Sequence, residues 1–197
     1  DALERTASQG WINILDGRVR STGFDLVLDD VRGRIDLTDG QIHTKDPITG
    51  RFHGADIELA LSSKEGEPFW NQPLLDIGLK AQANLEQMEV GFGQVFSGSD
   101  IKAKLGEIKG RVLLDTQLVL PLRSPRDLDF HGKLKILGLQ CNPTPRWFRG
   151  PLFLDQVEIM MNSSSISIMP ATARWGGMEI QLDGHLSPAG GWLKAST

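Results

Sequence analysis

Histidine and cysteine side chains are the first candidates for metal binding or nucleophilic chemistry in this sequence. The single cysteine, Cys141, excludes a zinc-binding cysteine cluster and an internal disulfide. HExxH and HxH patterns are absent, and no two histidines have the spacing of metal ligands. We therefore interpret all four histidines as ordinary surface or strand-end residues: His43, His53, His131 and His185.

Carboxylates offer a second possible chemistry, because carboxylate oxygens bind calcium and paired carboxyl groups hydrolyse glycosides. Asp29 and Asp30 are adjacent, but the aspartates around them do not have EF-hand spacing. We interpret them as solvated strand and turn residues. A glycosidase pair is defined by its distance in space, so the sequence points to none. Because GxSxG and phosphate-loop motifs are also absent, we expect neither an enzyme nor a cofactor.

Aromatic residues on a β scaffold can stack on sugars or lie at a lipid boundary. Trp147 and Phe148 stand between two arginines in a proline-rich loop and form the most suggestive aromatic group. We favour the interpretation that this loop plugs one end of a sheet. A carbohydrate-binding β-sandwich, or a glycan-active enzyme, is a third hypothesis, motivated by Trp70, Trp147 and Trp175.

The composition is that of a folded chain. Its 197 residues are 40% hydrophobic, and 21 Lys or Arg against 25 Asp or Glu give a net charge of −4. This balance argues against disorder and against the basic footprint that nucleic-acid binding needs. Apolar runs stay shorter than the roughly 18 residues of a membrane-spanning helix. We expect the chain to be a piece of a longer protein or a mature form, with any signal or anchor outside it.

Apolar residues alternate with polar ones along most of the chain. Ile57, Leu59 and Leu61 are one example, and residues 75–85 continue the pattern for eleven positions. Strict alternation is typical of antiparallel strands with one dry and one wet face. The sequence therefore predicts a mainly β fold with little helix: an elongated, strongly twisted antiparallel sheet, curled into a groove or an open sandwich.

Glycine-containing turns divide these strands. Asp-Gly pairs at residues 16–17, 39–40 and 183–184 predict tight hairpins. Residues 2–14 could begin as a short helix, although Gly10 weakens it. Without a clear linker, we expect one unit over residues 1–197, with a soft boundary near residues 97–100.

The dry face of such a sheet must be buried against a second sheet, a helix or a ligand. With few helices expected, the sheet either closes on itself as a sandwich or forms a trough that binds something apolar. The candidate wall of this groove is the alternating apolar set Leu26, Leu28, Ile35, Leu37, Ile57, Leu59, Leu61, Ile77 and Leu79.

Most of the chain resembles the AsmA-like family, most clearly in its C-terminal third. The segment Ala173-Arg-Trp-Gly-Gly-Met-Glu-Ile-Gln-Leu-Asp-Gly184 resembles the family pattern A-x-x-G-G-x-x-ϕ-x-ϕ-x-G, where ϕ is apolar. Residues 13–19 and 31–40 resemble the family's ϕ-x-(D/N)-G-x-ϕ and ϕ-x-G-x-ϕ-x-ϕ units.

The resemblance implies a bacterial protein anchored in the inner membrane by a helix outside this chain, with a large periplasmic β-rich part. Relatives of this family are viewed as repeating β-grooves that carry phospholipid towards the outer membrane. The resemblance therefore implies that this chain is a periplasmic, non-enzymatic module. Its implied partners are phospholipid or another acyl lipid and the flanking parts of the same protein. The alternative is a closed β-sandwich that acts as a structural or protein-interaction module.

Overall fold

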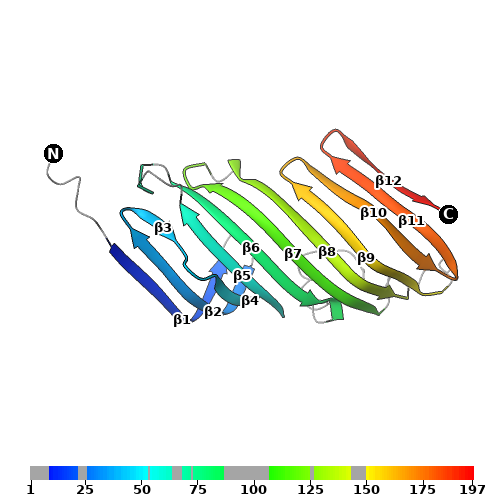
Figure 1. Ribbon diagram of the computed structural model, residues 1–197, viewed down its shortest axis with the longest axis horizontal. Coiled ribbons are helices and arrows are strands. Elements are labelled where there is room, and N and C mark those ends of the chain that lie inside the picture. The colour runs from blue at the N-terminus through cyan, green and yellow to red at the C-terminus, as the bar shows by residue number, and fades with distance from the viewer. Residues whose placement is uncertain are drawn as a thin grey trace. The chain divides into compact units, whose positions relative to one another are not determined.

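The computed structural model describes residues 9–21, 26–52, 54–63, 68–71, 73–86, 107–124, 127–142 and 150–197. These ranges form one antiparallel sheet of twelve strands, which confirms the predicted mainly β fold (Figure 1). The strands are β1 (Gln9–Ser21), β2 (Leu26–Thr38), β3 (Gln41–His43), β4 (Ile48–Phe52), β5 (Ala55–Ser63), β6 (Leu74–Asn84), β7 (Ile108–Pro121), β8 (Asp129–Cys141), β9 (Leu152–Asn162), β10 (Ser165–Trp175), β11 (Met178–Ser187) and β12 (Gly190–Ser196). Strands follow one another in chain order across the sheet, except that β4 lies off this path and pairs with β2 and β5.

The chain divides into two compact units, which we describe separately. Unit 1 comprises Asp1–Phe52, Asp56–Lys80 and Thr116–Phe130, and unit 2 comprises His53–Ala55, Ala81–Asp115 and His131–Thr197. The expected boundary near residues 97–100 lies outside the described residues. In the described ranges, no helix is long and apolar enough to cross a membrane.

In unit 1, β1 and β2 form a long hairpin pair whose register shifts on either side of Gly17. The Asp-Gly pair at residues 16–17 therefore lies within β1 and makes no turn, which corrects the predicted hairpin. Asp39 and Gly40 do form the β2–β3 turn, with φ angles of 51° and 77° that suit this pair. The short helix expected over residues 2–14 is wrong from Gln9 onward, where β1 begins.

Glycine also lets β4 approach β2 closely. A Cβ built on Gly33 would lie 2.9 Å from the Cα of Ile48, so no larger residue fits there without a backbone shift. The Ile48 side chain is buried on this glycine. This close approach anchors β4 beside the face that carries the alternating apolar residues of β2.

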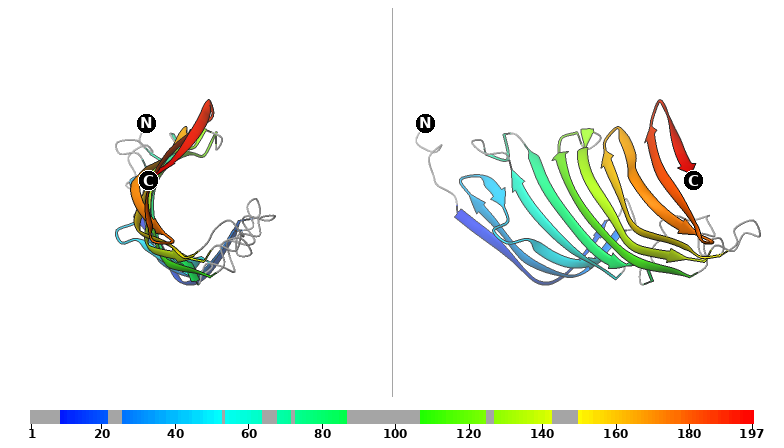
Figure 2. Two further views of the ribbon diagram at one scale, coloured as in Figure 1. Left: turned by 90° about the vertical axis from the view of Figure 1, so that its right-hand side faces the viewer. Right: turned by 45° about the vertical axis from the view of Figure 1, so that its right-hand side comes forward.

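In unit 2, β9 to β12 pair in sequence order as an antiparallel meander. The third Asp-Gly pair, Asp183-Gly184, lies inside β11 opposite Lys194 and Leu193, so this predicted hairpin is also wrong. Figure 2 shows that β9, β10 and β11 bend along their length. The register shifts between Ile168 and Ala171 mark a bulge in β10, and bulges bend the strands that carry them.

The core of unit 2 lies on one face of these strands. Leu154, Val157, Ala171 and Ala173 are buried, and the half-buried residues packed against them come from β8 to β11 as well. The cluster is thus made by neighbouring strands of the same sheet, whose side chains pack side by side. Among the described residues, no large side chain is less than 2% exposed. A closed core between two layers would bury several large apolar side chains almost completely.

Candidate functional site

The described histidines lie on different strands and have different neighbours. His43 pairs with Asp36 and Ser62 across strands, and His131 is exposed. His185 Nδ1 lies 2.9 Å from Ser167 Oγ on the neighbouring strand. Within the described ranges, no three His, Cys, Asp or Glu residues cluster closely enough to hold a metal ion. His53 lies outside these ranges.

The adjacent carboxylates Asp29 and Asp30 are exposed and paired with arginines. Asp29 Oδ1 lies 2.9 Å from Arg18 Nε, and Asp30 Oδ2 lies 3.9 Å from Arg51 Nη1. Asp30 shares Arg51 with Asp56, whose Oδ1 lies 3.5 Å from Arg51 Nε. This arrangement agrees with our interpretation of the pair as solvated strand residues.

The two described tryptophans of the carbohydrate hypothesis belong to different units, Trp70 to unit 1 and Trp175 to unit 2. Trp70 is exposed, and its ring lies against Gly40 in unit 1. Trp175 is half-buried in unit 2, opposite Leu152 and Met178 on the apolar face. Trp147 and Phe148 lie outside the described residues, so the aromatic loop stays a prediction.

The predicted groove residues of unit 1 share one face of the sheet. Cross-strand pairing puts Leu28, Ile35 and Leu37 opposite the apolar β1 positions or Gly10. His43 pairs with Asp36 on β2 and with Ser62 on β5, so these three residues lie on one face of the sheet. Because side chains alternate along a strand, the neighbours of Asp36 and Ser62 in the sequence lie on the opposite, apolar face. On β5 this face carries Ile57, Leu59 and Leu61. A Cβ built on Gly78 of β6 would lie 3.6 Å from the Ala60 Cβ on the polar face, so Ile77 and Leu79 lie on the apolar face as well. The side chain of Leu26 lies outside the described part.

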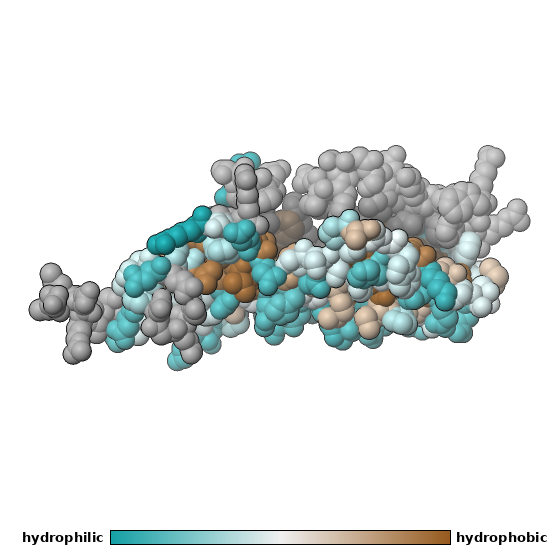
Figure 3. Space-filling model, turned by 90° about the horizontal axis from the view of Figure 1, so that it is seen from above, coloured by the Kyte–Doolittle hydropathy of each residue, from teal (hydrophilic) through white to brown (hydrophobic). Residues whose placement is uncertain are grey.

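Most of this face is only half-buried. Ile57 is 8% exposed, whereas the other predicted side chains described above are intermediate. Figure 3 shows brown, strongly hydrophobic patches between hydrophilic residues, and the lower margin of this view is mainly hydrophilic. A half-buried apolar face of this kind retains surface that a ligand can cover.

Unit 2 carries an apolar hollow that the predicted residue set does not include. It has a volume of about 390 Å³ and lies on β10, β11 and β12. We call it the glycine hollow. Its walls on the apolar face are Ile166, Ile168, Gly184, Leu186, Gly191 and Leu193, and the intervening His185 and Trp192 complete its lining.

Two glycines create this hollow. Gly184 pairs with Ile168 and Leu193, and Gly191 pairs with Leu186, so each replaces an apolar side chain in the row. A Cβ on Gly184 would meet Leu193 Cδ1 at 3.0 Å, and one on Gly191 would meet His185 O at 2.7 Å. The sequence signal was a glycine at an apolar position of the alternation Ile180, Leu182, Gly184, Leu186. Only the strand pairing shows that Gly191 lies near it.

The opposite face of unit 2 is charged. Lys133 and Lys135 on β8 contact Glu158 on β9 at 2.9 and 3.5 Å. The hydrogen bond from Lys133 holds the pKa of Glu158 below its usual value. On the apolar face, Cys141 is 2% exposed, and burial raises the pKa of its thiol. A neutral buried thiol is a poor nucleophile, so Cys141 serves as an apolar side chain.

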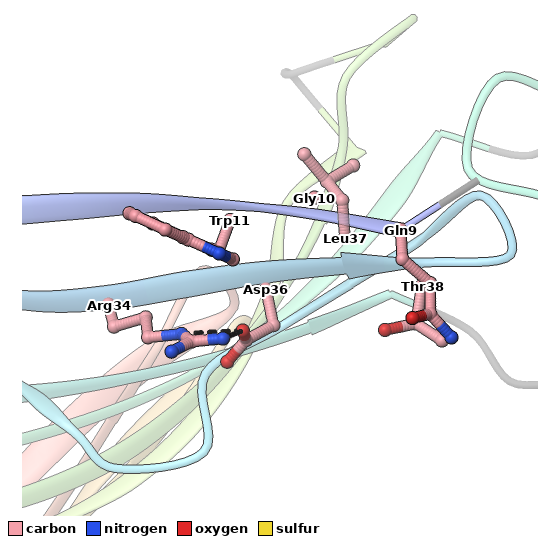
Figure 4. A pocket seen from close by; sticks show the side chains of 7 residues that line it. All are labelled: Gln9, Gly10, Trp11, Arg34, Asp36, Leu37 and Thr38. Atoms are coloured by element: carbon pink, nitrogen blue, oxygen red, sulfur yellow. Dashed lines mark hydrogen bonds and ion pairs between the residues drawn. The ribbon is translucent and has the colours of Figure 1, made fainter.

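A second, polar recess lies on the edge of unit 1 (Figure 4). Its volume is about 320 Å³, and it is lined by residues of β1 and β2. The Arg34 guanidinium lies 5.3 Å from the centre of the Trp11 ring, and Arg34 Nε donates to Asp36 Oδ1 at 2.6 Å. The Arg34 guanidinium is thus held by the Trp11 ring on its face and by the Asp36 carboxylate at its edge. We therefore interpret the recess as side-chain packing along the edge of the sheet.

No protein-family model matches this chain, and neither a curated protein nor a solved structure is detectably similar to it.

Proposed function

We propose that this chain is a non-enzymatic module that binds acyl chains of phospholipid or a similar lipid on the apolar face of its sheet. The observation that carries the proposal is the glycine hollow, an apolar recess open on the face of β10 to β12. Acyl chains bind by burying methylene groups, at about 0.8 kcal/mol for each one. They need an apolar wall rather than an arrangement of polar groups.

The half-buried face of unit 1 supports the same function. Within unit 1, the alternating residues form an apolar surface of their own. Within unit 2, the charged residues Lys133, Lys135 and Glu158 lie on the face opposite to the glycine hollow. The resemblance to AsmA-like proteins adds a cellular setting to the proposal. In that setting the chain is a periplasmic part of a longer envelope protein, tethered to the inner membrane, that helps phospholipid reach the outer membrane.

Native mass spectrometry after gentle extraction tests this function. We expect the protein to carry phospholipid. The double substitution Leu186→Glu with Leu193→Glu should lower the captured amount about tenfold, as a penalty near 1.4 kcal/mol predicts. Both residues are more than half exposed, so the fold should persist, as circular dichroism can verify. Met160→Glu, on the opposite face of β9, is the matched control. Protein that is always free of lipid would contradict the proposal.

The closed interaction module is the second candidate. It predicts that the apolar side chains are inaccessible to lipid. The packing within unit 2, where the described core residues all come from adjacent strands of one sheet, gives this candidate less support.

A further inference from the structure

Two leucines of the glycine hollow lie on the two glycines that create it. Gly184 on β11 pairs with Leu193 on β12, and Leu186 on β11 pairs with Gly191 on β12. A Cβ built on Gly184 would lie 3.0 Å from Leu193 Cδ1, and one built on Gly191 would lie 2.8 Å from Leu186 Cδ1. The end of each leucine therefore occupies the space beside the missing Cβ of its partner. Both side chains lie along the sheet, which lowers the apolar face at this place.

The hollow adjoins the closely packed core of unit 2. Ile168 lines the hollow and also packs against the buried cluster that includes Val157 and Ala171. The buried residues of this cluster are at most 8% exposed, whereas Leu186 and Leu193 are 57% and 71% exposed. One face of the sheet thus carries a filled stretch and, directly beside it, a recess.

The lining of the hollow suits a hydrocarbon group. Among its described lining residues, His185 is the one titratable side chain, and its Nδ1 lies 2.9 Å from Ser167 Oγ. The leucines and isoleucines offer only methyl and methylene groups. An apolar group that enters the hollow is therefore removed from water without leaving a polar atom unpaired.

An acyl chain that lies across the filled stretch and the recess meets two different requirements. A straight chain has the same width along its length, so its contact with the filled stretch leaves a gap above the recess. A gap of about 0.5–1 Å already forfeits a quarter to a half of the dispersion attraction between two atoms. A residual void also costs free energy in proportion to its volume. A chain with methyl branches is wider at each branch and places additional atoms in this gap.

We propose that the glycine hollow selects methyl-branched acyl chains over straight ones, and that Gly184 determines this specificity. Gly184 acts through Leu193, which lies low over residue 184 because no Cβ is present there. A larger residue at position 184 would displace Leu193 outward and make the recess shallower. The inference rests on the proposed lipid binding and adds to it which acyl chains the site prefers.

Vesicles that contain equal amounts of diphytanoylphosphatidylcholine and dipalmitoylphosphatidylcholine test this specificity with the whole chain. The two lipids share a headgroup and a main-chain length, and only the first carries methyl branches. Native mass spectrometry measures the ratio of branched to straight lipid that the protein takes up. We expect uptake to favour the branched lipid about threefold, as the filling of a small void predicts.

Variants with opposite effects on the hollow identify the residue responsible. Gly184→Ala should lower the ratio about threefold, whereas Leu193→Ala should raise the ratio because it deepens the recess. Leu193→Ala removes an exposed side chain and leaves the backbone unchanged, so it tests the proposal even where Gly184→Ala disturbs the pairing of β11 with β12. Gly10→Ala is the matched control and should leave the ratio unchanged, because nothing lies within 4 Å of its added Cβ.

The outcomes separate this specificity from lipid binding itself. Equal ratios in the unaltered protein and in both variants, or a ratio that falls in Leu193→Ala, would overturn the specificity and leave the proposed function standing. If the unaltered protein takes up neither lipid, the proposed function and the specificity are both overturned.

Discussion

Gly184 and Gly191 shape the hollow because each lacks a side chain in a row of apolar residues. Their surroundings are nevertheless different. An added Cβ on Gly184 would lie 3.0 Å from the end of the Leu193 side chain and 3.1 Å from the Trp192 carbonyl oxygen, whereas one on Gly191 would lie only 2.7 Å from the His185 carbonyl oxygen. The second glycine is therefore required for the close pairing of β11 and β12, in addition to leaving space.

Gly191→Ala should loosen β12. The new methyl group would lie 2.7 Å from His185 O, and overpacking of this kind costs about 1–3 kcal/mol. Hydrogen exchange of the β12 amides should accelerate while the rest of the chain keeps its protection. Gly10→Ala is the matched control, because nothing lies within 4 Å of its added Cβ. An unchanged exchange rate in Gly191→Ala would show that the β11–β12 pairing does not depend on this glycine.

The pKa of Glu158 offers a second test at the scale of single residues. Its folded pKa is lowered, so its contribution to stability is present above the unfolded pKa and is lost as the pH falls through the folded pKa. Lys133→Gln removes the main hydrogen bond and should raise the pKa of Glu158 towards its usual value. Carbon NMR of the carboxyl group measures this change. Lys109→Gln, which removes the cation beside Glu107, should leave the Glu158 titration unaltered.

At the scale of elements, alternation in the sequence predicted the strands well because one face of each strand packs and the other is solvated. The predicted set on β2, β5 and β6 lies on one face for this reason. Asp-Gly pairs predicted turns less well. Residues 39–40 make a hairpin, whereas residues 16–17 fall at a bulge and residues 183–184 inside a strand. A glycine that tolerates a turn also tolerates a bulge, and only pairing with neighbouring strands decides between them.

The glycine hollow also depends on how neighbouring strands pair, and the sequence therefore did not predict it. Its walls come from three strands, and the relation of Gly184 to Leu193 is fixed by the β11–β12 register. A sequence shows which residues share the face of one strand. It does not show which residues of the next strand lie beside them.

Strand β5 offers a test of whether the apolar face is open. Leu59→Glu places a charge at a half-buried position of this face. We expect the chain to stay folded by circular dichroism and to lose lipid capture about tenfold. Ala60→Glu, exposed on the opposite face, should change neither property. Global unfolding caused by Leu59→Glu alone would indicate a closed core, because an unpaired buried charge is costly.

At the scale of the whole molecule, both units leave apolar surface that the described residues do not fully cover. Val19 on β1 and Leu186 on β11 are 47% and 57% exposed on the apolar faces of their units. Exposed apolar area of this kind lowers the stability of the free chain relative to a state in which it is covered. A ligand that binds only the folded chain must therefore raise its stability.

Acyl-chain length should then control the thermal stability of the protein. A long-chain lysophospholipid, added below its micelle concentration, should raise the Tm more than a short-chain one with the same headgroup. The reason is that each added methylene contributes about 0.8 kcal/mol of burial when it is fully covered. Differential scanning calorimetry measures the shift, and the Leu186→Glu, Leu193→Glu variant should show a smaller one. Equal shifts for both chain lengths would indicate that headgroup contacts, rather than the apolar face, hold the lipid.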